Sequence, residues 1–271
     1  MTEKQITLAS GLSIFVKTLG SPDLPPVILL HGWPSSHDLW RNIGPDLAGK
    51  FQVIIPDLPG HGASDKPRDT CYDLAFYRTF IQDLVSALGL KRFRLVAHDL
   101  GAMAALSYAV HHGDAIEKLV IMNTCPHGRA SLRLNLTLLL LRQPLLSRFL
   151  LLPWVFKQIL KTGIYNHDLL DRSLTEQFRA PWIRTPEARA AFSATIALPL
   201  SRMAEPRDRL NTITCPSLIL WGKNDIFFPF FMAKRLHRDL PGSKLIGIDL
   251  AAHFCQEDNP GAVAKALTEF L

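Results

Sequence analysis

Short apolar runs, each bounded by polar residues, glycine or proline, recur in the first 124 residues and again after residue 211. Runs of this length predict β-strands. The later runs are continuously apolar, which is typical of strands buried on both faces of a sheet. We therefore expect strands at Ile6–Ala9, Leu12–Thr18, Val27–Leu30, Gln52–Ile55, Phe93–Ala97, Lys118–Met122, Ser217–Trp221 and Lys244–Ile248.

Segments between these runs predict helices. The segment Leu74–Leu88 is followed by Gly89, a residue type that commonly terminates helices. Further helices are expected directly after Asp99, near Phe231–Leu240 and at Gly261–Leu271. Strands that alternate with helices predict an α/β fold with a mostly parallel, twisted sheet wrapped by helices.

Residues 127–210 contain no clear strand and are rich in leucine, arginine, tryptophan and proline. We expect them to form an all-helical cap, or lid, inserted into a core domain made of residues 1–126 and 211–271. The leucine-rich part, Leu132–Trp154, is interrupted by arginines and prolines, so no apolar run approaches the roughly 18 residues that span a bilayer. We expect amphipathic helices there and no transmembrane segment.

The net charge of +6 is concentrated in the same region. Residues 127–210 contain 13 Lys and Arg against 6 Asp and Glu, a net charge of +7, so the remainder carries −1. The arginines stand singly among leucines and form no basic run with interleaved aromatic residues, which disfavours a nucleic-acid partner. A solvated helical surface explains them most simply, with contact to anionic lipid or attraction of an anionic ligand as the alternative.

Cysteine spacing and the N-terminus bear on localisation. Cys71, Cys125, Cys215 and Cys255 show no close pairing, which is typical of reduced thiols inside cells. The N-terminal sequence MTEKQITLAS lacks the positive-then-apolar pattern of a signal peptide. We therefore expect a cytoplasmic protein. Because cysteines and histidines also lack metal-ligand spacing, we expect no metal.

Polar motifs follow five of the predicted strands. In parallel sheets, ligands bind beyond the carboxyl ends of the strands, so these motifs contain the candidate site residues. In chain order they are HGWP (31–34), DLPGHGASD (57–65), AHDLG (97–101), GKND (222–225) and AAHF (251–254).

The AHDLG motif places Asp99 between two small residues, Ala97 and Gly101, each two positions away. A sharp turn from strand to helix needs small neighbours, because the backbone of its central residue is crowded. Such a turn directs the central side chain outward above the sheet, beside the backbone N–H groups of a helix start. Asp99 is therefore a candidate nucleophile, with a helix N-cap as the alternative.

In this order, the five motifs resemble those of the α/β-hydrolase fold family: oxyanion-hole loop, glycine-rich turn, nucleophile, acid and histidine. The resemblance covers nearly the whole chain. It implies that Asp99 is the nucleophile, that His253 is the general base that activates water, and that Asp225 is the acid that orients the histidine. Asp249, four residues before His253, is the competing candidate for the acid.

The same resemblance implies an oxyanion hole and a substrate pocket. Backbone N–H groups of Trp33 and Leu100 are expected to form the oxyanion hole. A leucine-rich cap favours a small, apolar substrate, with water as the second reactant and no organic cofactor. The expected pocket residues are Trp33, His98, Trp154, Trp182 and Phe254.

An aspartate nucleophile narrows the chemistry. A carboxylate is a poor nucleophile toward esters but suits displacement at an sp³ carbon, which produces an alkyl-enzyme ester that water then hydrolyses. In this respect the chain resembles epoxide hydrolases and haloalkane dehalogenases. An esterase or lipase is disfavoured.

These two enzyme types differ in what stabilises the leaving group. Epoxide hydrolases resemble this chain in the HGWP motif. They protonate the oxygen of the opening ring with hydroxyl groups of the cap, usually from two tyrosines. The cap of this chain has one tyrosine, Tyr165, and His167 is the candidate for the second donor. Haloalkane dehalogenases usually carry a tryptophan directly after the nucleophile, where this chain has Leu100. Their second N–H donor is often an asparagine after HG or a cap tryptophan, positions where this chain has Trp33, Trp154 and Trp182.

We therefore favour an epoxide hydrolase that converts an apolar epoxide to a vicinal diol through an ester on Asp99. A haloalkane dehalogenase-type hydrolase of carbon–halogen bonds is the alternative. A catalytically silent ligand binder with this fold is a third interpretation. It is disfavoured because Asp99, Asp225 and His253 are all present.

Overall fold

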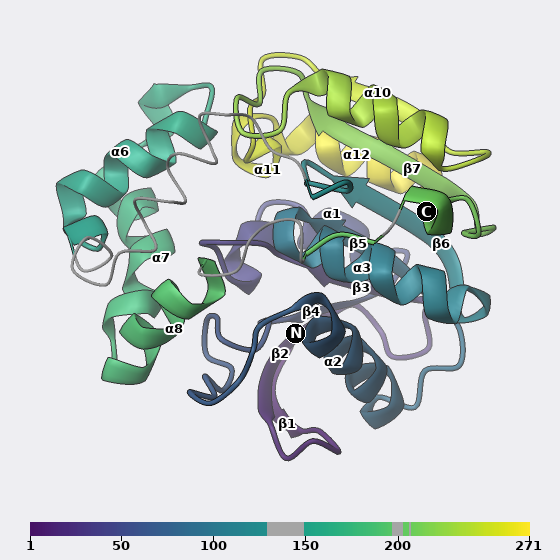
Figure 1. Ribbon diagram of the computed structural model, residues 1–271, viewed down its shortest axis with the longest axis horizontal. Coiled ribbons are helices and arrows are strands. Elements are labelled where there is room, and N and C mark those ends of the chain that lie inside the picture. The colour runs from purple at the N-terminus through teal and green to yellow at the C-terminus, as the bar shows by residue number, and fades with distance from the viewer. Residues whose placement is uncertain (129–148, 197–202, 206) are drawn as a thin grey trace.

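The computed structural model describes residues 1–128, 149–196, 203–205 and 207–271. Their centre is one eight-stranded sheet with strand order β1-β2-β4-β3-β5-β6-β7-β8 (Figure 1). The β1–β2 and β2–β4 pairs are antiparallel, and every other pair is parallel. The strands are β1 (Thr2–Thr7), β2 (Ser13–Leu19), β3 (Pro26–Leu30), β4 (Gln52–Pro56), β5 (Phe93–His98), β6 (Ile116–Met122), β7 (Ser217–Gly222) and β8 (Lys244–Ile248).

Helices cover both faces of the sheet, and alternate residues of each strand supply the two interfaces. Ile28 packs in one apolar cluster with α2, α3 and α10, whereas its neighbour Val27 packs in a second cluster with α1 and α12. This explains why the central strands are almost continuously apolar, since neither of their faces meets water. The helices are α1 (Gly44–Leu47), α2 (Leu74–Ala87), α3 (Asp99–His112), α10 (Phe230–Asp239), α11 (Cys255–Asp258) and α12 (Pro260–Phe270).

The predicted strands and core helices are confirmed with small shifts of their ends, and the largest difference lies at the first strand. We expected Ile6–Ala9, whereas β1 spans Thr2–Thr7. Most of β1 is exposed, and it is held by backbone pairing with β2 at the edge of the sheet. An exposed edge strand has no buried face, so hydrophobic patterning could not locate it.

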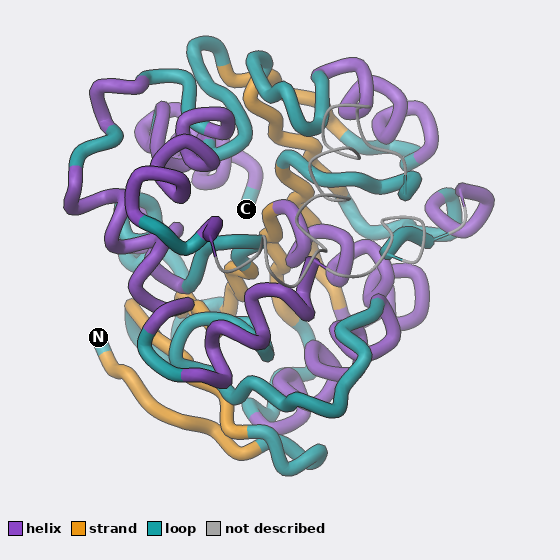
Figure 2. Tube along the Cα trace, turned by 60° about the vertical axis from the view of Figure 1, so that its left-hand side comes forward, coloured by secondary structure: helices purple, strands orange, loops and turns teal. Residues whose placement is uncertain are grey.

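Three helices stand apart from the sheet, at the left of Figure 1: α6 (Pro153–Gly163), α7 (Arg172–Ile183) and α8 (Pro186–Ile196). They follow β6 and precede β7 in the chain. Residues 149–196, which we call the helical insertion, contain no strand, as expected (Figure 2). Residues 129–148 and 197–202 of the predicted cap, and most of Leu132–Trp154, lie outside the described residues.

The insertion packs on the core through its apolar residues. Phe156 of α6, Phe178 and Trp182 of α7 and Phe192 of α8 are almost fully buried, in one cluster with Phe254 of the core. Among the described residues, no helix is both long and apolar enough to cross a membrane.

Candidate active site

Asp99 lies where β5 turns into α3, in the strained conformation that the AHDLG motif predicted. Its φ is +50°, a left-handed value that is uncommon for any residue other than glycine. Two glycines make room for the turn: a Cβ on Gly101 would lie 2.3 Å from the carbonyl oxygen of His31, and a Cβ on Gly32 would lie 2.4 Å from Cβ of Asp99. The local geometry therefore requires small residues at both positions.

The carboxylate of Asp99 faces two different environments. Oδ1 accepts a hydrogen bond of 2.8 Å from the backbone N–H of Trp33, and the N–H of Leu100 also stabilises the negative charge. Oδ2 lies 3.7 Å from Nε2 of His253. The structure thus brings both expected oxyanion-hole donors to the carboxylate of Asp99, with Trp33 at Oδ1 and His253 near Oδ2.

His253 lies in contact with Asp225, the residue predicted to orient it. Nδ1 of His253 lies 3.0 Å from Oδ2 of Asp225, and both residues are buried. The other oxygen, Oδ1, accepts from the backbone N–H groups of Phe227 and Phe228. A carboxylate fixed in this way holds the proton of the imidazole on Nδ1 and leaves Nε2 facing the nucleophile. Asp249, the competing candidate, instead pairs with Lys223 at the surface.

Burial and neighbouring charges act in opposite directions on the pKa values of Asp99 and His253. Burial raises the pKa of Asp99, although His253 and the backbone N–H groups of Leu100 and Trp33 counteract part of that rise. Burial alone would lower the pKa of His253, but the carboxylates of Asp225 and Asp99 outweigh it, so the pKa lies above its ordinary value. Burial therefore outweighs the groups that stabilise the carboxylate of Asp99, whereas the two carboxylates outweigh burial at His253.

Two residues after β6 complete the site, and the sequence analysis did not find them. Asn123 donates from Nδ2 to Oδ2 of Asp225 and accepts at Oδ1 from the N–H of Gly222. Thr124 donates to the backbone carbonyl of Asp99 at 2.7 Å. Their position at the carboxyl end of a central strand was the available signal.

The residues expected to line the pocket have different surroundings in the structure. Phe254 packs against His253, with ring centroids 4.9 Å apart. His98 is fully buried and lies with Nε2 2.9 Å from the backbone carbonyl of His253, so it supports the base. Trp182 is also fully buried and donates from Nε1 to the carbonyl of Pro34, which joins α7 to the HGWP loop.

The position of Trp154 contradicts the prediction that it lines the substrate pocket. Its side chain is 69% exposed on α6, so it does not line a buried pocket. Helix α6 turns Phe156 and Leu160 toward the core, and Trp154 does not share that face. Tyr165 is 44% exposed, with its backbone N–H bound to Asp258 next to the His253 loop. Its role as proton donor stays a prediction.

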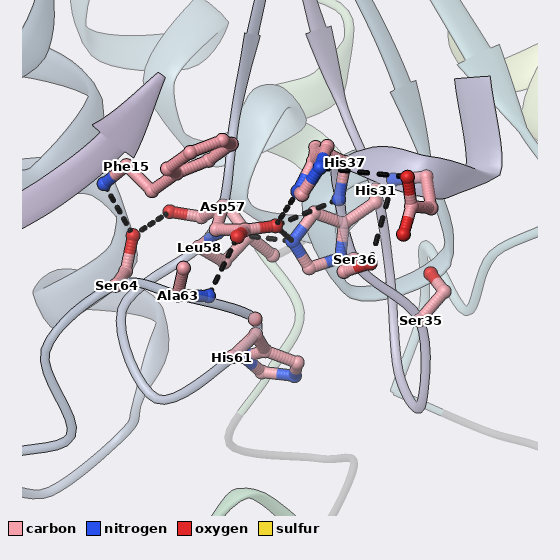
Figure 3. Close-up of polar contacts among 12 residues, drawn as sticks. Phe15, His31, Ser35, Ser36, His37, Asp57, Leu58, His61, Ala63 and Ser64 are labelled. Atoms are coloured by element: carbon pink, nitrogen blue, oxygen red, sulfur yellow. Dashed lines mark hydrogen bonds and ion pairs between the residues drawn. The ribbon is translucent and has the colours of Figure 1, made fainter. Parts of the chain in front are cut away.

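A buried polar cluster connects His31 of the HGWP loop with the segment that follows β4 (Figure 3). His31 lies with Nδ1 3.0 Å from the carbonyl of Gly32 and accepts at Nε2 from the N–H of Leu58. Burial lowers the pKa of His31 to about 4, so the ring is neutral at physiological pH. Beside it, Asp57 accepts from the backbone N–H groups of His37 and Ala63. No group of His, Cys, Asp and Glu within the described residues could hold a metal ion.

Comparison with known proteins agrees with this architecture. The family model described as "alpha/beta hydrolase fold" matches residues 25–260. Epoxide hydrolase 3 of Xenopus tropicalis is 27% identical over 280 residues, which covers 97% of this chain and 75% of that protein. Soluble epoxide hydrolase of Corynebacterium sp. (strain C12) is 43% identical over a shorter alignment of 101 residues, covering 37% of this chain and 35% of that protein.

Solved structures confirm the predicted fold class. Cfl2 from Burkholderia cenocepacia superposes with a TM-score of 0.86 at 22% identity, covering 99% of this chain and 95% of that chain. At this level of identity the similarity concerns the fold alone.

Proposed function

Because this chain belongs to the α/β-hydrolase fold family, we propose that it is a hydrolase that forms an alkyl-enzyme ester on Asp99 and converts an apolar epoxide to a vicinal diol. One observation carries the proposal: Asp99 has one oxygen in the oxyanion hole and the other oxygen free of it, 3.7 Å from the base. This arrangement suits a carboxylate that first attacks and then becomes the carbonyl group under attack.

In the first step, Oδ2 of Asp99 attacks a carbon of the epoxide ring. The carbon–oxygen bond of the ring breaks, and the ring oxygen takes a proton, which the proposal assigns to the phenol of Tyr165. Oδ1 keeps its hydrogen bond from the N–H of Trp33. The product of this step is a hydroxyalkyl ester of Asp99 and a tyrosinate.

In the second step, His253 removes a proton from water, and the resulting hydroxide attacks the ester carbonyl. Negative charge develops on Oδ1, where the oxyanion-hole donors stabilise it. Asp225 stabilises the imidazolium that forms on His253. The Cγ–Oδ2 bond then breaks, and Oδ2 leaves as a hydroxyl of the diol after taking the hydrogen of the added hydroxyl group. Asp99 regains its carboxylate with one oxygen from water, and the proton on His253 restores the tyrosine.

Most residues considered as N–H donors to a halide are not available for that role. Leu100 has no polar side-chain atom, Trp182 already donates to Pro34, and Trp154 is exposed. Trp33 is the exception, because its Nε1 is buried and donates to no partner among the described residues. Haloalkane dehalogenases hold the halide with two N–H donors, so a single available donor favours an epoxide over a haloalkane as the substrate. Because Trp33 does offer that one donor, a carbon–halogen hydrolase is the second candidate.

The surroundings of the base favour an uncharged, apolar substrate. The ring of His253 is flanked by those of Phe227, Phe228 and Phe254, with centroids 5.5, 5.5 and 4.9 Å away. Trp33 packs against Phe192 of the insertion at 5.3 Å. Aromatic walls with few polar groups are typical of sites for apolar ligands. The two relatives named as epoxide hydrolases support the same substrate class.

The test is the mass of the intact His253→Ala variant after separate exposure to an aryl epoxide and a primary bromoalkane. Without its base, the enzyme should retain the ester, so the mass should rise by that of the whole epoxide and not change with the bromide. A gain equal to the alkyl group from the bromide would establish the dehalogenase instead. The control is Asp99→Ala in the same background, which should form no adduct.

Failure of both probes to form an adduct with His253→Ala would contradict the covalent mechanism. It would favour the third interpretation, a silent binder. The complete geometry of Asp99, His253 and Asp225 argues against that interpretation, because a binder has no need for an oriented base.

A further inference from the structure

One carboxylate joins the helical insertion to the loop that carries the base. Asp258, the last residue of α11, accepts at Oδ1 from the backbone N–H groups of Tyr165 and Asn166, at 2.9 and 3.0 Å. Its Oδ2 accepts from the N–H of Tyr165 at 3.0 Å and of Ala252 at 2.9 Å. Ala252 directly precedes His253, so Asp258 binds the insertion and the base loop together.

A second contact joins the same two segments. The N–H of Phe254, directly after His253, donates to the carbonyl of Gly163 at 2.9 Å. A Cβ on Gly163 would lie 2.8 Å from Cε2 of Phe254, so the backbone of the insertion rests on that ring. His253 is therefore flanked by a direct contact to the insertion, at Phe254, and by an indirect one through Asp258, at Ala252.

Helix α11 itself is fixed to the core. Glu257 accepts two hydrogen bonds from Arg41, at 2.6 and 2.7 Å, and its side chain is almost fully buried. Arg41 directly follows a short 3₁₀ helix, His37–Trp40. Asp258 thus extends toward the insertion from a helix whose own position is set by a bidentate ion pair.

We propose that Asp258 is a positioning residue that couples the placement of the helical insertion to the placement of His253. The two carboxylate oxygens of Asp258 accept hydrogen bonds from three N–H groups, two in the insertion and one in the base loop. The insertion and the base loop therefore keep their positions only while both are bound to Asp258. When residues 163–166 lie against Asp258, Ala252 is fixed and the imidazole faces Asp99. When they move away, the base loop loses its support and the imidazole loses its alignment.

This proposal rests on the proposed function in one respect: it predicts which step is affected. Formation of the ester on Asp99 does not use the base, whereas hydrolysis of the ester does. Loss of the coupling should therefore slow the second step selectively. A role confined to overall stability would slow both steps or neither.

The chain offers a matched control. Arg68 of the core pairs with Glu187 of α8, a second link between core and insertion that does not contact the base loop. Asp258→Asn replaces one acceptor oxygen by an NH₂ group that faces bound N–H groups. Glu187→Gln makes the same carboxylate-to-amide change in the Arg68–Glu187 pair. Both variants are first compared with the wild-type protein by thermal unfolding, to show that they are folded.

Amide hydrogen exchange tests the coupling without any substrate. Asp258→Asn should accelerate exchange in peptides that cover residues 163–166 and also in those that cover 251–258, because both lose the same acceptor. Glu187→Gln should leave both regions unchanged. Acceleration in one region alone, or in neither, would overturn the proposal.

Single-turnover kinetics with an aryl epoxide test the consequence for the reaction. In Asp258→Asn the rate constant for ester hydrolysis should fall about tenfold or more, while that for ester formation stays within about twofold. In Glu187→Gln both should stay within about twofold of the wild type. Equal losses in both steps of Asp258→Asn, or an unchanged hydrolysis rate, would contradict the positioning role.

The two hypotheses fail in different ways. If His253→Ala forms no ester with either probe, the proposed function is wrong, and hydrogen exchange still decides whether Asp258 couples the two segments. If the ester forms but exchange is not coupled, the function stands and the role of Asp258 is wrong.

Discussion

Nδ2 of Asn123 lies 2.8 Å from Oδ2 of Asp225, the same oxygen that meets the imidazole of His253. Asn123 has a φ of +34° at the end of β6, and its own Oδ1 accepts from the N–H of Gly222 at the end of β7. One amide therefore ties two strand ends together and supplies a donor to the acid. It limits the positions from which Asp225 can contact His253.

Replacing Asn123 with alanine should lower kcat about tenfold, because Asp225 loses a donor and gains freedom to move. Ester hydrolysis should slow more than ester formation, since only hydrolysis needs an oriented base. Steady-state and single-turnover rates with an aryl epoxide measure this. Asn224→Ala is the control, because that neighbouring residue is exposed and contributes its backbone alone. An Asn123→Ala variant with wild-type rates would show that the amide is dispensable.

The pH dependence of hydrolysis follows from the raised pKa of His253. The imidazole acts as a base only when neutral, so the rate of ester hydrolysis should rise with pH through a pKa above 6.5. Asp225→Asn removes the main group that raises this pKa and leaves the burial that lowers it. The rising limb should move to lower pH while the maximal rate falls by about four orders of magnitude. A limb that does not move would mean that another group controls it.

The close approach of two backbones at the nucleophile makes a steric prediction. Gly32→Ala should abolish ester formation, because the added methyl group would lie 2.5 Å from Oδ1 of Asp99 and would occupy the space beside the oxyanion hole. Gly49→Ala is the matched control, since a Cβ there meets nothing within 4 Å. Intact mass after exposure to the aryl epoxide distinguishes them. Adduct formation by Gly32→Ala at the wild-type rate would contradict the observed geometry.

Much of this architecture could be predicted from the sequence, because buried parallel strands and their polar carboxyl ends leave local signals. Asp99, Asp225 and His253 each lie within five residues of the end of an apolar run, so a parallel sheet brings them to one edge. Asn123 has the same kind of position after β6, but its contact with Asp225 lies 102 residues away in the chain and cannot be read from the sequence. Asp258 left no such signal, and its partner Tyr165 lies 93 residues away. Trp154 and Trp182 are both helical tryptophans in the insertion, and only the tertiary packing makes one exposed and the other buried.

The exposed position of Trp154 gives a direct test of that correction. Trp154→Ser should leave both rate constants within about twofold of the wild type, as is usual for surface substitutions. Trp182→Phe should lower both, because it removes the hydrogen bond to Pro34 that joins α7 to the HGWP loop. A loss of activity in Trp154→Ser would return that residue to the substrate pocket.

Acid should destabilise the folded protein through histidines that are buried in the neutral form. Burial lowers the pKa of His31 to about 4 and that of His61 well below its ordinary value, so below pH 6.5 the unfolded chain binds protons that the folded chain does not. The free energy of unfolding should therefore fall between pH 6.5 and about 4, with about 3 kcal/mol from His31 alone. His37 acts in the opposite sense. Its raised pKa stabilises the fold below 6.5, and this contribution is lost as pH rises through the folded pKa.

His61→Phe isolates one of these groups. The ring of His61 packs edge-on against Trp182 at 4.9 Å, and its Nε2 has no partner among the described residues, so a phenyl ring can keep most of the packing. Without the titrating nitrogen, the free energy of unfolding should fall less between about pH 7 and about pH 5 than in the wild type. Urea unfolding at several pH values measures the difference. An equal slope in His61→Phe would mean that His61 already binds a proton in the folded state.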